Sequence, residues 1–218
     1  MAKDLAIVLN SGSINSAVVT ALATQKHRVV LLHADTSPVD VSAGALNAYG
    51  GQMASFKTFR EHTLPMPFLS TIHDKTLASG GHDPRLAKPT LPALRDLTPF
   101  LGLAVTYALA YEANAIYVGL RMGPEIDGLA RATEYFQIWN EMLQLTLGRP
   151  ELEVVAPLLD LEPWQVIDLG FQVNAPLDRT WSCTDGASDA CGSCRGCRSR
   201  DAAFMQAAKP DPLKPARR

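Results

Sequence analysis

The sequence contains no apolar run long enough to cross a membrane. Its longest such run, residues 100–111, is shorter than the roughly 20 residues that a spanning helix needs. The N-terminus also lacks the charged and then apolar layout of a secretion signal. Lys and Arg number 20 against 22 Asp and Glu, so no excess of one charge points to a polyanionic partner. We therefore expect a cytoplasmic protein whose partners include neither a membrane nor a nucleic acid.

Paired histidines and internal repeats are also missing. The five histidines show no spacing of the kind that places two ring nitrogens on one metal ion, so each is expected to lie on the surface or to pack in the core. With 218 residues, of which 47% are hydrophobic, the chain can bury a substantial core. Its length suggests one domain with at most a small appendage.

Cysteine is absent until residue 183, and all four cysteines then fall within fifteen residues. A disulfide scaffold would distribute its cysteines along the chain to join distant segments. The spacing C-x7-C-x2-C-x2-C, with glycines at 192 and 196, instead suits four thiolates around one zinc ion with no position left for water, which is a structural site. Two disulfides or a redox-active pair are the alternatives. The predicted ligands are Cys183, Cys191, Cys194 and Cys197.

Short apolar runs alternate with longer amphipathic segments, which is typical of an α/β fold. Strands are predicted at 5–9, 29–33, 115–120 and 152–157, and helices at 15–25, 97–113, 127–147 and 162–169. Residues 41–61 are ambiguous because Gly50 and Gly51 interrupt a helical pattern, and proline-rich 63–99 is expected to form loops and short helices. From 174 onward we expect irregular structure. Apolar strands joined by helices indicate a parallel sheet wound on both faces.

The turn between the first strand and the first helix consists of small residues. Within "VLNSGSINSAVV" (8–19), the backbone N–H groups at the helix start can bind an anion such as a pyrophosphate. The simpler alternative is a turn in which Ser13 or Asn15 caps the helix. The residues of this candidate phosphate loop are Ser11, Gly12, Ser13, Ile14, Asn15 and Ser16.

The same loop resembles the PP-loop, S-G-G-x-D-S, of N-type ATP pyrophosphatases. The C-terminal run, in which Thr180, Trp181 and Ser182 precede the four cysteines, resembles one branch of that superfamily, the 7-cyano-7-deazaguanine synthases of queuosine biosynthesis. Weaker matches to this family are Asp35 after the second strand, Gly119 in the third strand, and Arg95 with Asp96 where the family has Arg-Asn.

The resemblance implies an adenine-nucleotide α hydrolase-like fold, which is Rossmann-like, followed by a C-terminal zinc knuckle. We divide the chain into a nucleotide-binding domain (1–173), a zinc-binding subdomain (174–207) and, because its end is proline-rich and basic, a disordered tail (208–218). The resemblance also implies a homodimer and an ATP-dependent ligase that adenylates the carboxylate of a 7-deazaguanine acid and converts it, with ammonia, to an amide and then a nitrile. No catalytic side chain is assigned.

ATP with Mg²⁺ is expected at residues 11–16, Asp35 and Gly119. Trp181 is expected to pack on the knuckle or to form a wall of the substrate site. Arg95 and Asp96 are further candidates for substrate binding. Arg121 and Arg131 follow the third strand, where open parallel sheets bind ligands, and either could meet an anion.

Several family positions differ in this chain. Ser13 replaces the second loop glycine, Asn15 replaces the loop aspartate, 36–38 differ from the family's Tyr-Gly-Gln, and 127–132 replace its Tyr-Pro-Asp-Cys-Arg segment. If the loop needs a positive φ at Ser13, the Cβ costs about 1–2 kcal/mol there. Asn15 lacks the charge that would retain a cation. A degenerate relative that serves as a ligand-binding or partner-binding module is therefore the alternative function.

Overall fold

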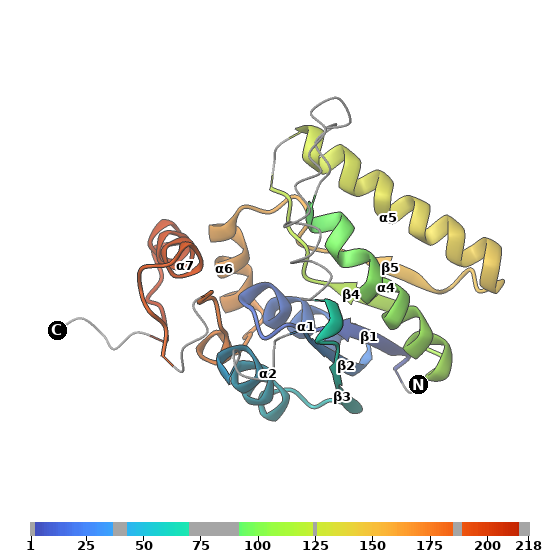
Figure 1. Cartoon of the computed structure of the whole chain (residues 1–218), viewed down its shortest axis with the longest axis horizontal. Coiled ribbons are helices and arrows are strands. Elements are labelled where there is room, and N and C mark those ends of the chain that lie inside the picture. The colour runs from blue at the N-terminus through green and yellow to red at the C-terminus, as the bar shows by residue number, and fades with distance from the viewer. Residues whose placement is uncertain (1–2, 37–42, 70–91, 124–125, 185–188, 214–218) are drawn as a thin grey trace.

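The computed structural model describes residues 3–36, 43–69, 92–123, 126–184 and 189–213. Its centre is a sheet of five parallel strands in the order β3-β2-β1-β4-β5 (Figure 1). The strands are β1 (Leu5–Leu9), β2 (Arg28–Asp35), β3 (Arg60–Pro65), β4 (Ala115–Val118) and β5 (Glu153–Val155). The order reverses between β1 and β4, which is the topological switch point of an open parallel sheet.

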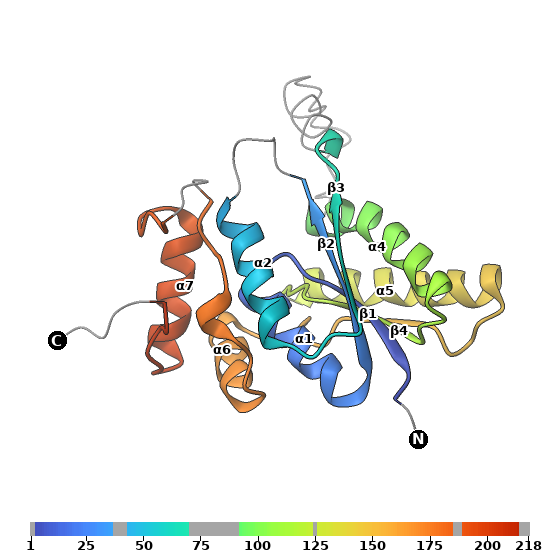
Figure 2. The same cartoon turned by 90° about the horizontal axis from the view of Figure 1, so that it is seen from below.

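Helices cover both faces of this sheet, as Figure 2 shows. One side has α1 (Ile14–Lys26), α2 (Ala43–Ser55) and α6 (Pro163–Gln172), with α7 (Arg195–Gln206) packed outside α6. The other side has α4 (Pro92–Ala110) and α5 (Ile126–Leu147). The predicted doubly wound α/β fold is therefore confirmed. Among the described helices, none combines the length and the apolar character needed to cross a bilayer.

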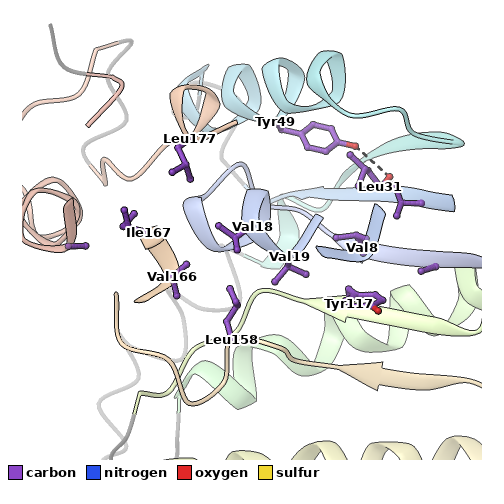
Figure 3. Close-up of a cluster of buried hydrophobic side chains, with 14 of the residues drawn as sticks. Val8, Val18, Val19, Leu31, Tyr49, Tyr117, Leu158, Val166, Ile167 and Leu177 are labelled. Carbon is purple, nitrogen blue, oxygen red and sulfur yellow. Dashed lines mark hydrogen bonds between the residues drawn. The ribbon is translucent and has the colours of Figure 1, made fainter. Parts of the chain in front are cut away.

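Alternating strand residues build two separate cores. Ala6 and Val8 of β1 face the cluster formed with α1, α2, α6 and α7, part of which is drawn in Figure 3, whereas Ile7 faces the cluster under α4 and α5. All three side chains are fully buried, as expected for a central parallel strand. Phe204 of α7 belongs to the first cluster, so the cysteine-containing segment shares a core with the sheet.

The ambiguous segment 41–61 resolves into α2 and the start of β3. Gly50 and Gly51 lie inside α2, where Gly51 leaves room for the Arg179 side chain, since a Cβ would sit 3.1 Å from its Cδ. The strand β3 was not predicted, because its burial alternates along a largely exposed edge strand. Most of the predicted loop region, residues 70–91, lies outside the described residues.

Helices α4 and α7 differ most from the prediction, while α1, α5 and α6 lie within three residues of their predicted bounds. Helix α4 begins at Pro92 rather than at 97, so Pro99 lies inside the helix instead of in its first turn. Pro99 is exposed, where water can satisfy the carbonyl that loses its helical partner. The expectation of irregular structure after 174 is wrong for α7. That helix is capped at its N-terminus by the thiol of Cys194, which accepts from the Cys197 N–H, a role that the apolar pattern did not reveal.

Residue 211 is held in place, although the predicted disordered tail begins at 208. The Arg200 guanidinium donates to both carboxylate oxygens of Asp211 at 2.7 Å, and each side chain is 6% exposed. Arg200 also donates to Thr180 Oγ1 and to the Leu177 carbonyl. A buried guanidinium with these partners fixes α7 against the segment that precedes the cysteines. Residues 214–218 lie outside the described residues.

Replacing Asp211 with Ala should lower the free energy of unfolding by about 3 kcal/mol, because it leaves the buried Arg200 without its counter-charge. Urea denaturation followed by circular dichroism measures this. The matched control is Glu151→Ala, which breaks the exposed Arg149–Glu151 pair and should change stability little. Equal effects of the two substitutions would contradict the importance assigned to the buried pair.

Candidate functional site

A cavity of about 410 Å³ opens at the carboxyl ends of β1 and β4, at the switch point of the sheet. The phosphate-loop candidates lie on its polar side, and strand ends together with α4 form its apolar wall. The polar lining residues are Asn10, Ser11, Ser13, Ser16, Thr36 and Asp96. The others are Leu9, Leu32, Ala34, Ala93, Leu97, Phe100, Val118, Gly119 and Leu120.

The loop turns at Gly12, whose φ of +79° is in the left-handed region. A Cβ at this position would lie 2.5 Å from the Ala45 carbonyl oxygen of α2, so a larger residue is excluded by contact as well as by conformation. The Gly12 N–H donates to Asn10 Oδ1 at 2.8 Å. Sequence and tertiary contact thus agree on glycine here.

Ser13 does not need the positive φ considered for it. Its φ of −79° and ψ of 169° are ordinary for a helix N-cap, and its hydroxyl accepts from the Ser16 N–H at 3.3 Å. The conditional strain of a Cβ at this position is therefore absent. Of the two predicted caps for α1, Ser13 and not Asn15 is the one observed.

Three hydroxyl groups meet beside the first turn of α1. The Oγ atoms of Ser11, Ser13 and Ser16 lie 3.0 to 3.2 Å from one another. The first turn of a helix leaves backbone N–H groups without intrahelical partners, and the helix dipole adds partial positive charge there. Hydroxyl donors and N–H groups at one edge of the cavity form a surface that can accept an anionic group.

Asn15 joins this loop to the end of β4. Its side-chain Nδ2 donates to the Gly119 carbonyl at 3.0 Å. A Cβ on Gly119 would lie 3.1 Å from the Asn15 carbonyl carbon and the Ser16 nitrogen, so glycine permits the close approach of strand and loop. An ionised aspartate at position 15 could not donate this hydrogen bond, which gives Asn15 a structural role of its own.

The remaining predicted residues are placed unequally. Asp35 ends β2 and is half-buried, at the same edge of the sheet as the cavity. Asp96 lines the cavity, whereas the guanidinium of its neighbour Arg95 is exposed and pairs with the Asp96 carboxylate at 2.8 Å. Ile14 packs against the core. Arg121 donates to the Leu161 carbonyl, and Arg131 is exposed on α5.

Trp181 packs closely against α2. A Cβ on Gly44 would overlap its indole at 2.3 Å from Cε2, so Gly44 makes room for the ring. The Trp181 backbone N–H donates to the Gly12 carbonyl at 2.9 Å. Trp181 is not among the residues lining the described cavity, and its contacts place the segment before the cysteines directly against the loop.

Sequence reasoning missed the buried polar groups behind the loop. Gln52 of α2 is fully buried and hydrogen-bonds to Asn10, Gly12 and Arg179. His33 is stacked on Tyr49 and donates from Nδ1 to the Asn10 carbonyl at 2.8 Å. It is buried, so it takes the core-packing role, one of the two expected for the histidines. The polar residue Asn10, directly after an apolar strand, could have indicated a buried polar group at this position. Gln52 lay in the segment whose secondary structure was ambiguous from the sequence.

The four sulfur atoms of the cysteine cluster lie within 4.8 Å of one another, and none is in a disulfide. Four thiolates about 2.3 Å from a tetrahedral zinc ion would be about 3.8 Å apart. The Cys194–Cys183 sulfur distance of 3.9 Å fits that geometry. Gly192, with φ +74°, provides the turn between the second and third thiols. A Cβ on Gly196 would lie 1.8 Å from the Ser182 carbonyl oxygen, so the two backbones meet there.

The cluster already favours one thiolate. Hydrogen bonds from the side chain and backbone of Thr184, and from the Cys197 N–H, lower the pKa of Cys194 to about 5. Burial and hydrogen bonding to Cys194 raise the pKa of Cys197 to about 12. A cation would displace the proton from the buried thiol, as thiolate metal sites require. The arrangement can therefore hold a metal ion.

Comparisons with known proteins show which proteins this chain resembles. Curated relatives named 7-cyano-7-deazaguanine synthase include one from Methanothrix thermoacetophila, 33% identical over 120 residues, which is 54% of this chain and 53% of the relative. Another, from Chlorobium chlorochromatii, is 27% identical over 217 residues, covering 95% and 94%. The first alignments thus span about half the length of the relatives.

Among solved structures, the NMN synthetase from Francisella tularensis aligns with a TM-score of 0.52 at 14% identity, over 96% of this chain and 79% of that one, which shows a shared fold. The profile of the family described as "Queuosine biosynthesis protein QueC" matches residues 5–208. Since this match spans both residues 11–16, called the serine loop from here on, and the cysteine cluster, the chain belongs to the QueC family.

Proposed function

We propose that this protein uses ATP to activate the carboxylate of 7-carboxy-7-deazaguanine or a closely related acid. The observation that carries the proposal is the cavity at the switch point, where the serine loop, the start of α1 and Gly119 meet, in a chain of the QueC family. The carboxylate oxygen would attack the α-phosphorus of ATP and release pyrophosphate. Ammonia would then displace AMP to give the amide. A second adenylation, on the amide oxygen, would let AMP leave with formation of the nitrile.

In this proposal the serine loop binds the phosphate groups. Hydroxyls of Ser11, Ser13 and Ser16 and the N–H groups of the first turn of α1 donate hydrogen bonds to them, in a site arranged before substrate binds. The apolar wall from β1, β2 and α4 is suited to the flat face of a purine. Asp35, at the end of the neighbouring strand, is proposed to lie near the ribose or adenine.

Magnesium would screen the phosphate charges. Asp96 is the charged side chain among the described residues that line the cavity, and its carboxylate is a ligand type that Mg²⁺ accepts. Asn15 can offer only a neutral amide oxygen while its Nδ2 is bound to Gly119. Retention of the cation would therefore depend on the nucleotide and Asp96 more than on the loop.

We propose zinc as the metal of the four cysteines, in a structural role, because thiolate-only tetrahedral sites without an open position favour it. Four free thiols fit a reducing compartment such as the cytoplasm. The homodimer implied by the family resemblance stays a prediction.

A second candidate function is a module that binds a nucleotide-like ligand without turnover. Two observations favour it. Asn15 replaces a carboxylate with a group already committed to Gly119, and the described lining of the cavity includes no cationic side chain to offset phosphate charge. Ligand would then bind at the same loop, and no pyrophosphate would be released.

The activity test is to incubate the protein with Mg-ATP, ammonium and 7-carboxy-7-deazaguanine. We expect pyrophosphate and AMP in equal amounts, and the nitrile by mass spectrometry. Omission of the acid is the control, because pyrophosphate release should depend on it. Saturable Mg-ATP binding without acid-dependent pyrophosphate would support the binding module, and absence of both would overturn the ligase proposal.

Gly12→Ala should abolish Mg-ATP binding and lower the free energy of unfolding by about 2 kcal/mol or more, because the residue is left-handed and faces the Ala45 carbonyl. Ser13→Gly is the matched variant. Since Ser13 is already unstrained and caps α1, its replacement should not tighten Mg-ATP binding. Isothermal titration calorimetry distinguishes the two, and a tenfold gain for Ser13→Gly would contradict the observed geometry.

Metal analysis should find one zinc ion per chain in reduced protein. Cys194→Ser should lose it and destabilise the C-terminal segment, because metal binding is coupled to folding there. Zinc affinity should fall as the pH is lowered, since protons compete for the thiolates. Ser193→Ala, which leaves all four ligands in place, is the control and should keep the metal. Zinc that persists in Cys194→Ser would refute the four-thiolate site.

A further inference from the structure

The serine loop and the cysteine segment are joined by one buried group of hydrogen bonds. The Gly12 carbonyl accepts from the Trp181 N–H at 2.9 Å and from Gln52 Nε2 at 3.0 Å. The same Nε2 donates to the Arg179 carbonyl at 2.9 Å. Arg179 and Trp181 lie four and two residues before the first cysteine. The backbone leading into the cluster therefore contacts the loop at its left-handed residue.

Gln52 is the one side chain that contacts both segments in this group. It is fully buried on α2, and its Oε1 accepts from Asn10 Nδ2 at 2.9 Å, so both its donor sites and its acceptor are used. Asn10 in turn accepts from the Gly12 N–H. Gly12 is thus held at its N–H by Asn10 and at its carbonyl by Gln52 and Trp181.

Residues 180–182, which precede the first cysteine, are held in turn by contacts with α7. Gly196 of α7 lies against the Ser182 carbonyl, and Arg200 of α7 donates to Thr180 Oγ1. Residues 180–182 are therefore positioned by α7, the helix that Cys194 caps. A metal ion that orders the cluster would order these residues, and with them the Trp181 N–H and the adjoining Arg179 carbonyl, which accepts from the second donor to Gly12, Gln52 Nε2.

We propose that Gln52 is a positioning residue which couples metal binding at the cysteines to the conformation of the serine loop, so that the loop binds nucleotide phosphate strongly only when the cluster holds its metal. Only the part of this proposal that concerns nucleotide binding rests on the proposed function. The effect of the metal on the loop conformation requires no catalysis and no nucleotide.

The variant Gln52→Met keeps a long side chain but cannot donate to Gly12 or Arg179. The matched control is Tyr49→Phe, on the same helix, which removes a buried hydroxyl bonded to the Leu31 and His62 carbonyls and leaves the donors to Gly12 in place. Gln52→Glu, which when ionised retains only the acceptor, serves as a second variant should the methionine protein fail to fold.

Hydrogen exchange of the 11–17 segment is measured with Zn²⁺ bound and after chelation. In the parent and in Tyr49→Phe, we expect chelation to speed exchange of the Gly12 N–H, which donates to Asn10 Oδ1, by about tenfold, the equivalent of one lost hydrogen bond. In Gln52→Met the ratio should fall to about threefold or less, because Asn10 and the Gly12 carbonyl have both lost the side chain that links them to Arg179. A merely structural role for Gln52 would speed exchange equally in both metal states and leave the ratio unchanged.

Mg-ATP titrations of the same proteins form the second arm. Chelation should weaken binding about tenfold in the parent and clearly less in Gln52→Met. Failure of the parent to bind Mg-ATP would count against the proposed function and leave the exchange arm as the test of coupling. The coupling would be overturned if the exchange rate of Gly12 in the parent were the same with and without zinc. It would also be overturned if chelation changed that rate by the same factor in Gln52→Met as in the parent.

Discussion

The left-handed conformation of Gly12 is the constraint on which the site depends. It lets the chain leave β1 and enter α1 with the hydroxyls of Ser11, Ser13 and Ser16 on one side. Three separate parts of the chain hold it, since Asn10 follows β1, Gln52 belongs to α2, and Trp181 precedes the cysteines. A conformation that is unfavourable for most residues is tolerated where the surroundings determine it this fully.

In this arrangement the cysteine segment affects the conformation of the serine loop as well as its own stability. Small metal knuckles commonly close a local loop, but here the residues before Cys183 lie against α2 and the loop, and α7 shares the main core through Phe204. The buried Arg200–Asp211 pair joins α7 to the residues that follow it. Local order at the cluster is thereby connected to the loop at the carboxyl edge of the sheet, through the Trp181 backbone N–H and the buried Gln52 side chain.

How much of this could be predicted from sequence depended on the kind of signal. The central strands β1 and β4 and the cysteine ligand set follow from apolar runs and spacing, which are local. The buried role of Gln52 could not be predicted in this way, because a single glutamine beside two glycines is typical of a surface position. Its hydrogen-bond partners at 10, 12 and 179 are distant in sequence and come close only in the folded protein. Helix α7 was missed since its apolar residues are few and its start is set by a thiol cap. The backbone φ of Ser13 is set by the fold, and the sequence alone did not show whether it would be positive or negative.

The departures from the family loop therefore differ in meaning. Ser13 is compatible with the loop, because an N-cap serine satisfies the Ser16 N–H and adds a hydroxyl to the cavity edge. Asn15 preserves geometry while changing charge, since its amide ties the loop to Gly119 in a way that an ionised carboxylate could not. The donors that could form a cradle for an anion are therefore present, whereas the loop at 11–16 offers no carboxylate for a cation. Binding of phosphate and its activation toward displacement are separable demands on such a site, because the first needs donors and the second also needs charge where pyrophosphate leaves. Of the described residues that line the cavity, Asp96 is the one with a carboxylate, so under the proposed function retention of the cation would depend on α4 as much as on the loop.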